Sequence, residues 1–169
     1  FNLFVVRPEN CDRYCLSVDL PRNQLNGTAV VRYIQYGEEQ GLHKRNTFAS
    51  KPEWYRFKVR RPAELVAPCG VGATFFSAIN EARAVSSNSY TEFRLHNPEE
   101  LLPIWAVLNS ALFWLQLELT GRRSLGGGML KVDPIEYRQL RVLNPRLLNR
   151  YAIQIRQTLQ ALGKREVMN

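Results

Sequence analysis

The chain has 169 residues, of which 45% are hydrophobic and 22% are charged, and this balance excludes a disordered tail and predicts a globular protein. The net charge is +8, and 18 of the 23 basic residues are arginine. Such an excess predicts a polyanionic partner. Basic side chains displace the cations condensed on phosphates, and arginine forms paired hydrogen bonds with phosphates and guanine.

The start of the sequence and its apolar segments bear on the class of protein. The sequence begins at Phe1 with no initiator methionine, and no secretory pattern precedes the first predicted element. We therefore expect a piece of a longer polypeptide. The longest apolar stretch, residues 101–119, is interrupted by polar residues, so we expect no membrane partner.

Cysteine and histidine are too few and too unfavourably spaced to indicate a zinc site. The candidates are Cys11, Cys15, Cys69, His43 and His96. We therefore expect no metal ion, and we expect reduced thiols in a cytoplasm.

The first elements in chain order are two short apolar runs, residues 1–6 and 14–20, which predict strands. Asn26 can cap a helix that ends at Gly41. Gly37 lies inside this helix and weakens it, so we expect the helix to be short or frayed.

Residues 42–61 form a basic run around Trp54 and Tyr55, and alternation predicts a strand that begins near Trp54. Cations near aromatic rings suit a surface that follows a nucleic-acid backbone. We expect phosphate contacts from Lys44, Arg45, Lys51, Arg60 and Arg61. For the two aromatic residues we favour the alternative, a position in the hydrophobic core.

A series of short strands follows and predicts a largely antiparallel sheet. These strands are residues 65–68, 74–78, 82–85 and 90–95, with turns between them. Asn97 then caps the strongest predicted helix, which ends at Gly121. Because this helix is apolar nearly all round, we expect it to lie buried against the sheet.

A loop rich in glycine and arginine follows the long helix. Glycine allows backbone amides to approach a phosphate closely, so we expect this loop near the DNA groove. The residues expected there are Arg122, Arg123, Ser124, Gly126, Gly127 and Lys131. At least one arginine is a candidate for reading guanine. The alternative is a flexible connector after a glycine helix cap.

The C-terminal part predicts a short strand over residues 129–132, a brief helix capped by Asp133 and a last helix over residues 145–162. The last helix has an apolar face, and its other face carries Arg146, Arg150 and Arg156. We expect this basic face to be solvated, with phosphate contact as the secondary interpretation.

The sequence contains no recognisable catalytic constellation. No complete phosphate-binding glycine motif occurs, and the three aspartates form no nuclease-like cluster with glutamate and lysine. His96 is better explained as a surface residue than as a general base, and His43, within the basic run, is better explained as a residue that helps to bind phosphate. We therefore expect no catalytic residue in this chain.

Six ordered motifs give the sequence a resemblance to a known family. They are residues 31–34 with 37–38, the basic run into Trp54 and Tyr55, residues 65–68, residues 82–85 with 88–90, residues 108–110, and residues 121–122 followed by 126–131. In this order they resemble the C-terminal target-recognition domain of N6-adenine DNA methyltransferases, such as those of single-chain type II restriction–modification enzymes. The last two motifs are the most specific.

The resemblance implies that an upstream methylase module binds S-adenosylmethionine and flips the target adenine, while this chain holds double-stranded DNA. The segments that start at Asn97 and Asn144 do not replace the methylase's Asn-Pro-Pro-Tyr type motif, because they lack its second proline and its aromatic residue. No cofactor is therefore expected in this fragment. Asn109 and Ser110, within the predicted helix, are expected to satisfy local polar groups.

We predict an α+β fold in one DNA-recognition domain over residues 1–169. A mostly antiparallel, twisted sheet would pack against the long helix, and the C-terminal helix would flank it. Two alternatives stay open for the function. One is the specificity module of a multi-subunit restriction system, and the other is a basic protein-interaction domain that docks on an acidic partner.

Overall fold

The computed structural model describes residues 4–72, 74–123 and 127–163. The chain forms two units: a core unit of Phe1–Arg13 with Arg61–Asn169, and an inserted unit of Tyr14–Arg60. Each unit has its own cluster of buried hydrophobic residues. That the two units act as one recognition domain stays a prediction.

The core unit has the α+β fold that the sequence predicts. Its described strands are β1 (Val5–Val6), β2 (Leu65–Pro68), β3 (Gly70–Val71), β4 (Ala78–Asn80), β5 (Tyr90–Phe93) and β6 (Leu130–Lys131). Its described helices are the 3₁₀ turns η1 (Pro8–Asn10), η4 (Pro98–Glu100) and η5 (Pro145–Tyr151), and the α-helices α2 (Leu101–Leu108), α3 (Ala111–Thr120), α4 (Pro134–Tyr137) and α5 (Ala152–Gly163).

The sheet is mostly antiparallel, as predicted. Four strands lie in the order β1-β4-β2-β5, in which β2 runs antiparallel to both neighbours and β1 runs parallel to β4. Leu65 lies at the centre, opposite Ile79 on one side and Phe93 on the other. The strands β3 and β6 form a separate antiparallel pair.

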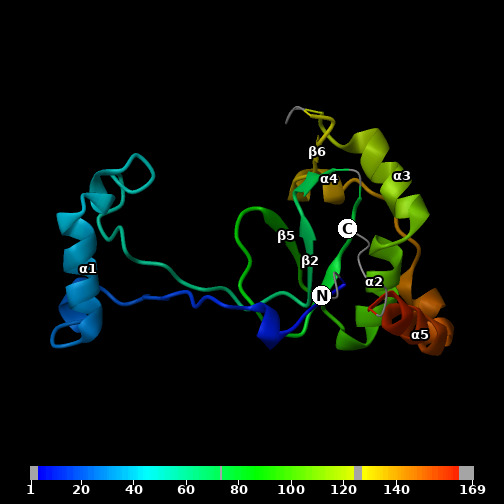
Figure 1. Ribbon diagram of the computed structural model, residues 1–169, viewed down its shortest axis with the longest axis horizontal. Helices are drawn as coiled ribbons and strands as arrows, with labels where there is room; N and C mark the ends of the chain where they lie inside the picture. Colours follow the sequence, from blue (N-terminus) through cyan, green and yellow to red (C-terminus); the bar gives the residue numbers. More distant parts are fainter. Residues whose placement is uncertain (1–3, 73, 124–126, 164–169) are drawn as a thin grey trace. The chain divides into compact units, whose positions relative to one another are not determined.

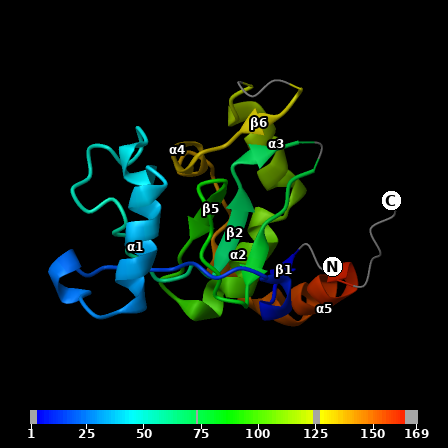
Figure 2. The same cartoon turned by 60° about the vertical axis from the view of Figure 1, so that its left-hand side comes forward.

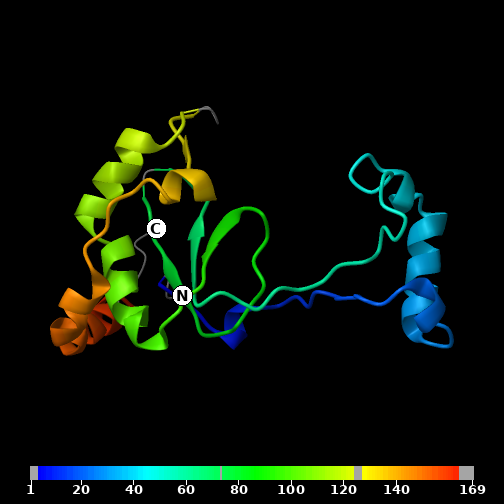
Figure 3. The same ribbon diagram turned by 180° about the vertical axis from the view of Figure 1, so that it is seen from behind.

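The helices α2, α3 and α5 lie on the same side of the four-stranded sheet (Figures 1 and 3). In Figure 2 the strands β2 and β5 lie in front of α2. Leu65, Ala67 and Ile79 of the sheet share one buried cluster with Trp105 of α2 and Leu117 of α3. The C-terminal helix α5 packs against α2, which confirms the predicted flanking position.

The single long helix predicted over residues 97–120 is wrong, because the chain bends by 67° between α2 and α3. Ser110 caps α3 by accepting a hydrogen bond from the Phe113 amide at 3.2 Å. The Asn109 side chain accepts a bond from the Ser77 amide at 2.9 Å and donates to Ser77 Oγ at 2.7 Å and to the Trp105 carbonyl at 2.8 Å. These bonds confirm that Asn109 and Ser110 satisfy local polar groups.

The bend also leaves part of α3 outside the core. Phe113 and Leu117 are buried, whereas Leu112, Leu115 and Leu119 are exposed, so the expectation of a helix buried all round is wrong for α3. Within the described ranges, no single helix is long and apolar enough to cross a membrane. One bent pair, Pro98–Leu108 with Ala111–Thr120, meets that test by length and composition only.

Two strands predicted within the core unit differ from the structure. The one placed at residues 74–78 begins only at Ala78, where its pairing with β2 begins. Residues 82–85 form no strand, because the Asn80 side chain bonds both the amide and the carbonyl of Ala84. Arg83 lies between them with a φ of 52°, a turn conformation that does not fit a strand.

The inserted unit is built on one helix, as predicted, but Thr28 and not Asn26 is the residue at its N-terminal cap. It contains η2 (Arg22–Gln24), α1 (Ala29–Glu39) and η3 (Leu42–Lys44). The strands predicted at residues 14–20 and from Trp54 onward are wrong, because they meet only in an isolated bridge between Val18 and Phe57. Among the described residues of this unit, no third strand pairs with either segment, and an isolated pair of strands is only marginally stable.

Gly37 lies inside α1 because the Trp54 ring packs directly on it. A Cβ atom at this position would lie 2.9 Å from Trp54 Cζ2. The Trp54 ring is also in edge contact with the rings of Phe48 and Tyr55, at centroid distances of 6.0 and 6.3 Å. Glycine therefore permits close packing here, and the core position favoured for the two aromatic residues at 54 and 55 is confirmed.

We predict that Asn109→Ala destabilises the core unit by about 3 kcal/mol. The variant leaves the buried amide and hydroxyl of Ser77 without their partner, and each unsatisfied buried polar group costs about 1–3 kcal/mol. Urea unfolding measures the change. Asn149→Ala is the matched control, since this exposed residue should change stability by less than about 0.5 kcal/mol. Equal effects of the two substitutions would contradict the role of Asn109.

Candidate nucleic-acid interface

The inserted unit uses most of its acidic side chains internally. It contains eight lysines and arginines against four acidic residues. Arg22 forms a two-armed ion pair with Glu38, in which Nη2 lies 2.9 Å from Oε2. Arg56 contacts Glu53 at 2.8 Å and Asp19 at 3.2 Å. Three of the four acids are therefore already bound to arginine.

These ion pairs lower the pKa values of the three carboxyl groups. Hydrogen bonds from Arg56 are the main cause for Asp19 and Glu53, and hydrogen bonds from Arg22 are the main cause for Glu38. The pKa values of both guanidinium groups are raised for the same reason. The acids stay ionised and paired near neutral pH, so their negative charge is locally compensated.

Five cations of the inserted unit have no acidic partner among the described residues. They are Arg32, Lys44, Arg45, Lys51 and Arg60, and all five are exposed. Four of them are predicted phosphate contacts. In the same part of the chain, Glu39 is the acid of this unit that lacks an ion pair. The unit thus presents more free positive than free negative charge, which attracts a polyanion.

Lys44 and Arg45 follow closely on α1. Gly41 ends the helix with a φ of 70°, and the chain turns into η3, whose last residue is Lys44. Lys51 Nζ lies 5.7 Å from the centroid of the Phe48 ring. The Lys51 ammonium group therefore lies over the face of an aromatic ring, at a distance at which a cation is attracted to the ring.

Arg122 and Lys131, two of the residues expected near the DNA groove, are engaged with acids in the core unit. Their backbones pair, with N–O distances of 3.0 and 2.8 Å. The Arg122 guanidinium contacts both Asp133 and Glu136, and Lys131 Nζ lies 3.3 Å from Asp133. These contacts close the base of the glycine-rich loop. A phosphate would have to compete with carboxylates for both cations.

The remaining predicted residues of the core unit differ in whether they have an acidic partner. Arg61 pairs with Glu64, whereas Arg123 has no acidic partner among the described residues. Ser124 and Gly126 lie outside the described residues. Gly127 adopts a φ of 58°, a turn conformation that favours glycine. A DNA contact for any residue of this loop stays a prediction.

The basic face of the C-terminal helix is exposed, as expected. Arg146 lies 3.6 Å from Glu100, and the Arg150 guanidinium lies 4.9 Å from the centroid of the Tyr151 ring. Arg156 is exposed on α5. Arg146 and Arg150 therefore have local contacts, and they lie on η5, because the predicted last helix begins as a 3₁₀ segment before α5. Nothing in the arrangement of the three arginines marks a built anion site.

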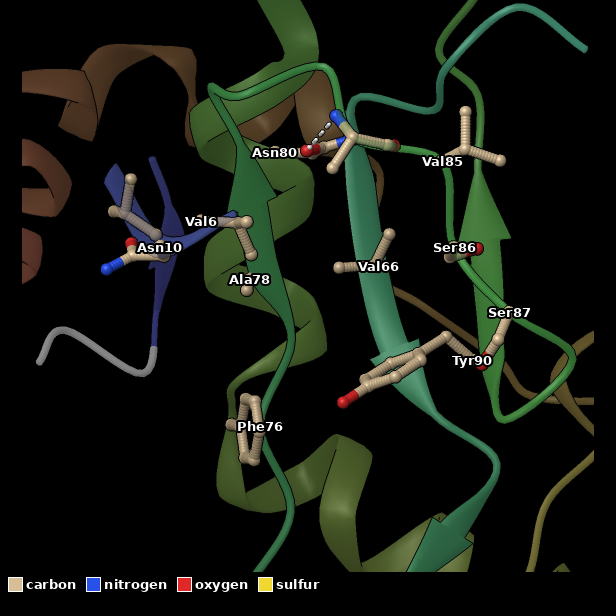
Figure 4. Close-up of a pocket in the computed structure, with 12 residues that line it drawn as sticks. Val6, Asn10, Val66, Phe76, Ala78, Asn80, Val85, Ser86, Ser87 and Tyr90 are labelled. Carbon is tan, nitrogen blue, oxygen red and sulfur yellow. Dashed lines mark hydrogen bonds between the residues drawn. The ribbon is translucent and has the colours of Figure 1, made fainter. Parts of the chain in front are cut away.

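A pocket of about 440 Å³ lies on the sheet face that is turned away from the helices (Figure 4). Val6, Val66 and Ala78 line it from the strands, and Ser86 and Ser87 line it from a loop. Its lining contains no carboxylate, histidine, cysteine or basic side chain, so it offers no general acid or base of those types. Among the described residues, no group of three metal-ligating side chains comes together.

One exposed surface was missed by the prediction from sequence. Arg32, Tyr33, Tyr36 and Gln40 lie on the solvent side of α1, or at its C-terminal end, and all four are exposed. These four residues are spaced by one, three and four positions, and they lie opposite the buried residues Ile34 and Gly37. This helical spacing is the signal that would have identified the face from the sequence.

The family of the chain follows from a comparison with protein-family models. The model of the C-terminal domain of the type II methyltransferase M.Eco57I matches residues 9–168. This match defines the class of the chain as a C-terminal domain of type II methyltransferases. The chain belongs to the M.Eco57I C-terminal domain family, which confirms the resemblance seen in the sequence. Comparisons with curated proteins and with solved structures found no match.

We predict that acid weakens the inserted unit. Its three paired carboxyl groups have lowered pKa values in the folded state and ordinary ones, 3.8 for aspartate and 4.5 for glutamate, when unfolded. Between the folded and unfolded values, the unfolded chain binds more protons. The stabilisation is thus complete above about pH 4.5 and is lost as the pH falls through the folded values. The NMR indole signal of Trp54 reports on this unit.

The control for acid sensitivity is the unpaired acid of the same unit. Glu39→Gln should leave the acid transition of the Trp54 signal unchanged, whereas Glu53→Gln should reduce its pH dependence because one linked proton is removed. If the Trp54 signal stays native through the whole acid range, the three ion pairs do not stabilise the inserted unit as predicted.

Proposed function

We propose that this chain is the target-recognition domain of an S-adenosylmethionine-dependent adenine-N6 DNA methyltransferase in a restriction–modification system. In this proposal it binds double-stranded DNA at a specific sequence, and a methylase module of the same polypeptide binds the cofactor and transfers the methyl group. The observation that carries the proposal is the set of unpaired, exposed cations on the inserted unit of a methyltransferase-family chain.

Phosphate contacts would come mainly from the inserted unit. Lys44, Arg45, Lys51 and Arg60 have no acid to satisfy them among the described residues, so their charge is available to release counterions from DNA. In the core unit, Arg123 is the cation of the glycine-rich loop best placed for a similar role. Arg122 would chiefly hold the loop's base together through Asp133 and Glu136.

The chemistry of methyl transfer would lie outside this chain. Its role is to hold the duplex so that the methylase module can reach an adenine turned out of the stack. We infer that the chain itself needs neither cofactor nor metal ion, has no membrane partner and works in a cytoplasm. The family assignment and the lack of acid–base groups around the sheet-face pocket support this division of labour.

We predict salt-sensitive binding to duplex DNA. The logarithm of the binding constant should fall linearly with the logarithm of salt concentration, with a slope of about −0.9 for each phosphate neutralised. Lys44→Ala combined with Arg45→Ala should weaken binding to all duplexes and reduce that slope by about 2. Fluorescence anisotropy with a labelled random-sequence duplex measures both quantities.

The control removes the same charge elsewhere. Arg138→Ala combined with Arg156→Ala takes two exposed arginines from the core unit, neither of which has an acidic partner among the described residues. It should change the slope by less than the double variant of the inserted unit. Equal losses would show that only net charge matters. A chain that binds an acidic protein but no duplex would support the protein-interaction alternative instead.

Adenine specificity has its own test. Joined to its methylase module, the chain should direct methylation to N6 of adenine within the duplex sequence that it selects, and mass spectrometry of digested DNA identifies the methylated base. The isolated chain should transfer no methyl group, because in this proposal the methylase module supplies both the cofactor and the pocket for the flipped base. Methylation of cytosine, or activity of the isolated chain, would contradict this part of the proposal.

A further inference from the structure

The outer face of α1 carries a row of polar and aromatic side chains. Ala29, Arg32, Tyr33, Tyr36 and Gln40 are spaced by three, one, three and four residues, so they line one side of the helix and its C-terminal end. Tyr33 and Tyr36 are 62% and 57% exposed. Both rings are therefore accessible to a ligand on this side of the helix.

The opposite face fixes this orientation. Ile34 is 1% exposed, and Gly37 is covered by the Trp54 ring. Because these two contacts anchor one side of α1, the helix cannot rotate about its axis without breaking the core of the inserted unit. Packing on the buried face therefore keeps the outer row exposed to solvent. Substitution of a side chain in the outer row should not change the orientation of the helix.

The charges around this row favour a polyanion as its partner. Arg32 within the row has no acidic partner among the described residues, and Lys44 and Arg45 follow at the C-terminal end of the helix. Glu38, on the other side of the helix, is neutralised by Arg22. Glu39 lies on the same side of the helix as Arg32 and has no ion pair among the described residues, but Arg32, Lys44 and Arg45 outnumber it. The row therefore combines groups that hydrogen-bond with a net positive surround.

We propose that α1 is the recognition helix of this domain and that its outer row enters the major groove of DNA. Arg32 would bond O6 and N7 of a guanine, and Tyr33, Tyr36 and Gln40 would contact neighbouring base edges or phosphates. This inference rests on the proposed function, because it assigns base reading within a domain proposed to bind duplex DNA.

The dimensions of α1 suit this role. Its 11 residues span about 16 Å, or three turns. The major groove is about 12 Å wide, which admits one α-helix with its side chains. The short side chain of Ala29 at the start of the row allows the helix backbone to approach the groove. The other four unpaired cations, Lys44, Arg45, Lys51 and Arg60, then supply sequence-independent affinity, and the row supplies discrimination between sequences.

The test separates discrimination from affinity. Selection from a random duplex library with the full chain first yields its preferred sequence, and anisotropy then gives the ratio of affinities for this duplex and a scrambled one. Arg32→Ala should lower the ratio by about tenfold or more, the value of one bidentate contact to a base. Lys44→Ala should weaken binding to both duplexes by similar factors and leave the ratio nearly unchanged.

Arg32→Lys is the sharper variant, because it keeps the charge and removes the planar fork. We expect it to bind the scrambled duplex like the unaltered chain and to lose most of the preference. Circular dichroism and the Trp54 NMR signal establish whether each variant is folded. We expect folded variants, because the substituted positions are exposed.

The outcomes distinguish this inference from the proposed function. If the unaltered chain prefers one duplex, and both Arg32 variants keep that preference, the assignment of α1 as the recognition helix is overturned while DNA recognition stands. If the unaltered chain binds no duplex, the proposed function fails with it. Binding of single strands in preference to duplexes would also overturn the groove assignment, with Tyr33 and Tyr36 then serving as stacking platforms.

Discussion

The contact between Trp54 and Gly37 is the constraint on which the inserted unit depends. A ring that lies directly on a helix is possible only where the helix has no side chain, and the rings of Phe48 and Tyr55 hold Trp54 from its other sides. The contact decides which face of α1 is buried. Everything proposed about the exposed face follows from this choice, because the helix presents to solvent whatever lies opposite Gly37.

The charged residues of the inserted unit fall into two groups: arginines that are paired with acids, and cations that have no acidic partner among the described residues. Arg22 and Arg56 are bound by carboxylates and stabilise the local structure, while Lys44, Arg45 and others are left without an acid among the described residues. Surface ion pairs contribute little free energy each. Their importance here lies in removing negative charge from a surface whose proposed ligand is an anion.

The core unit shows that family motifs and DNA contacts are different things. Asn109 and Ser110, from one of the most specific motifs, are engaged in closing the bend between α2 and α3 and in holding Ser77. Arg122, from the other, bonds Asp133 and Glu136. These residues build the scaffold. The proposed reading of DNA instead involves exposed side chains that no core contact requires, and such positions are free to differ between proteins of one fold.

The sequence by itself determined the α+β class, β2, β5, α1 with its stop at Gly41, the helix capped by Asp133, and the family. It could do so because each depends on local periodicity, on capping or turn residues, or on ordered motifs. It did not determine the bend at Asn109, the loss of the strand at residues 82–85 or the exposed leucines of α3. Those depend on Ser77, Ala84 and the sheet, which local patterns do not place. Tertiary structure also decided which cations are free, since ion pairs such as that of Arg56 with Asp19 join residues 37 positions apart.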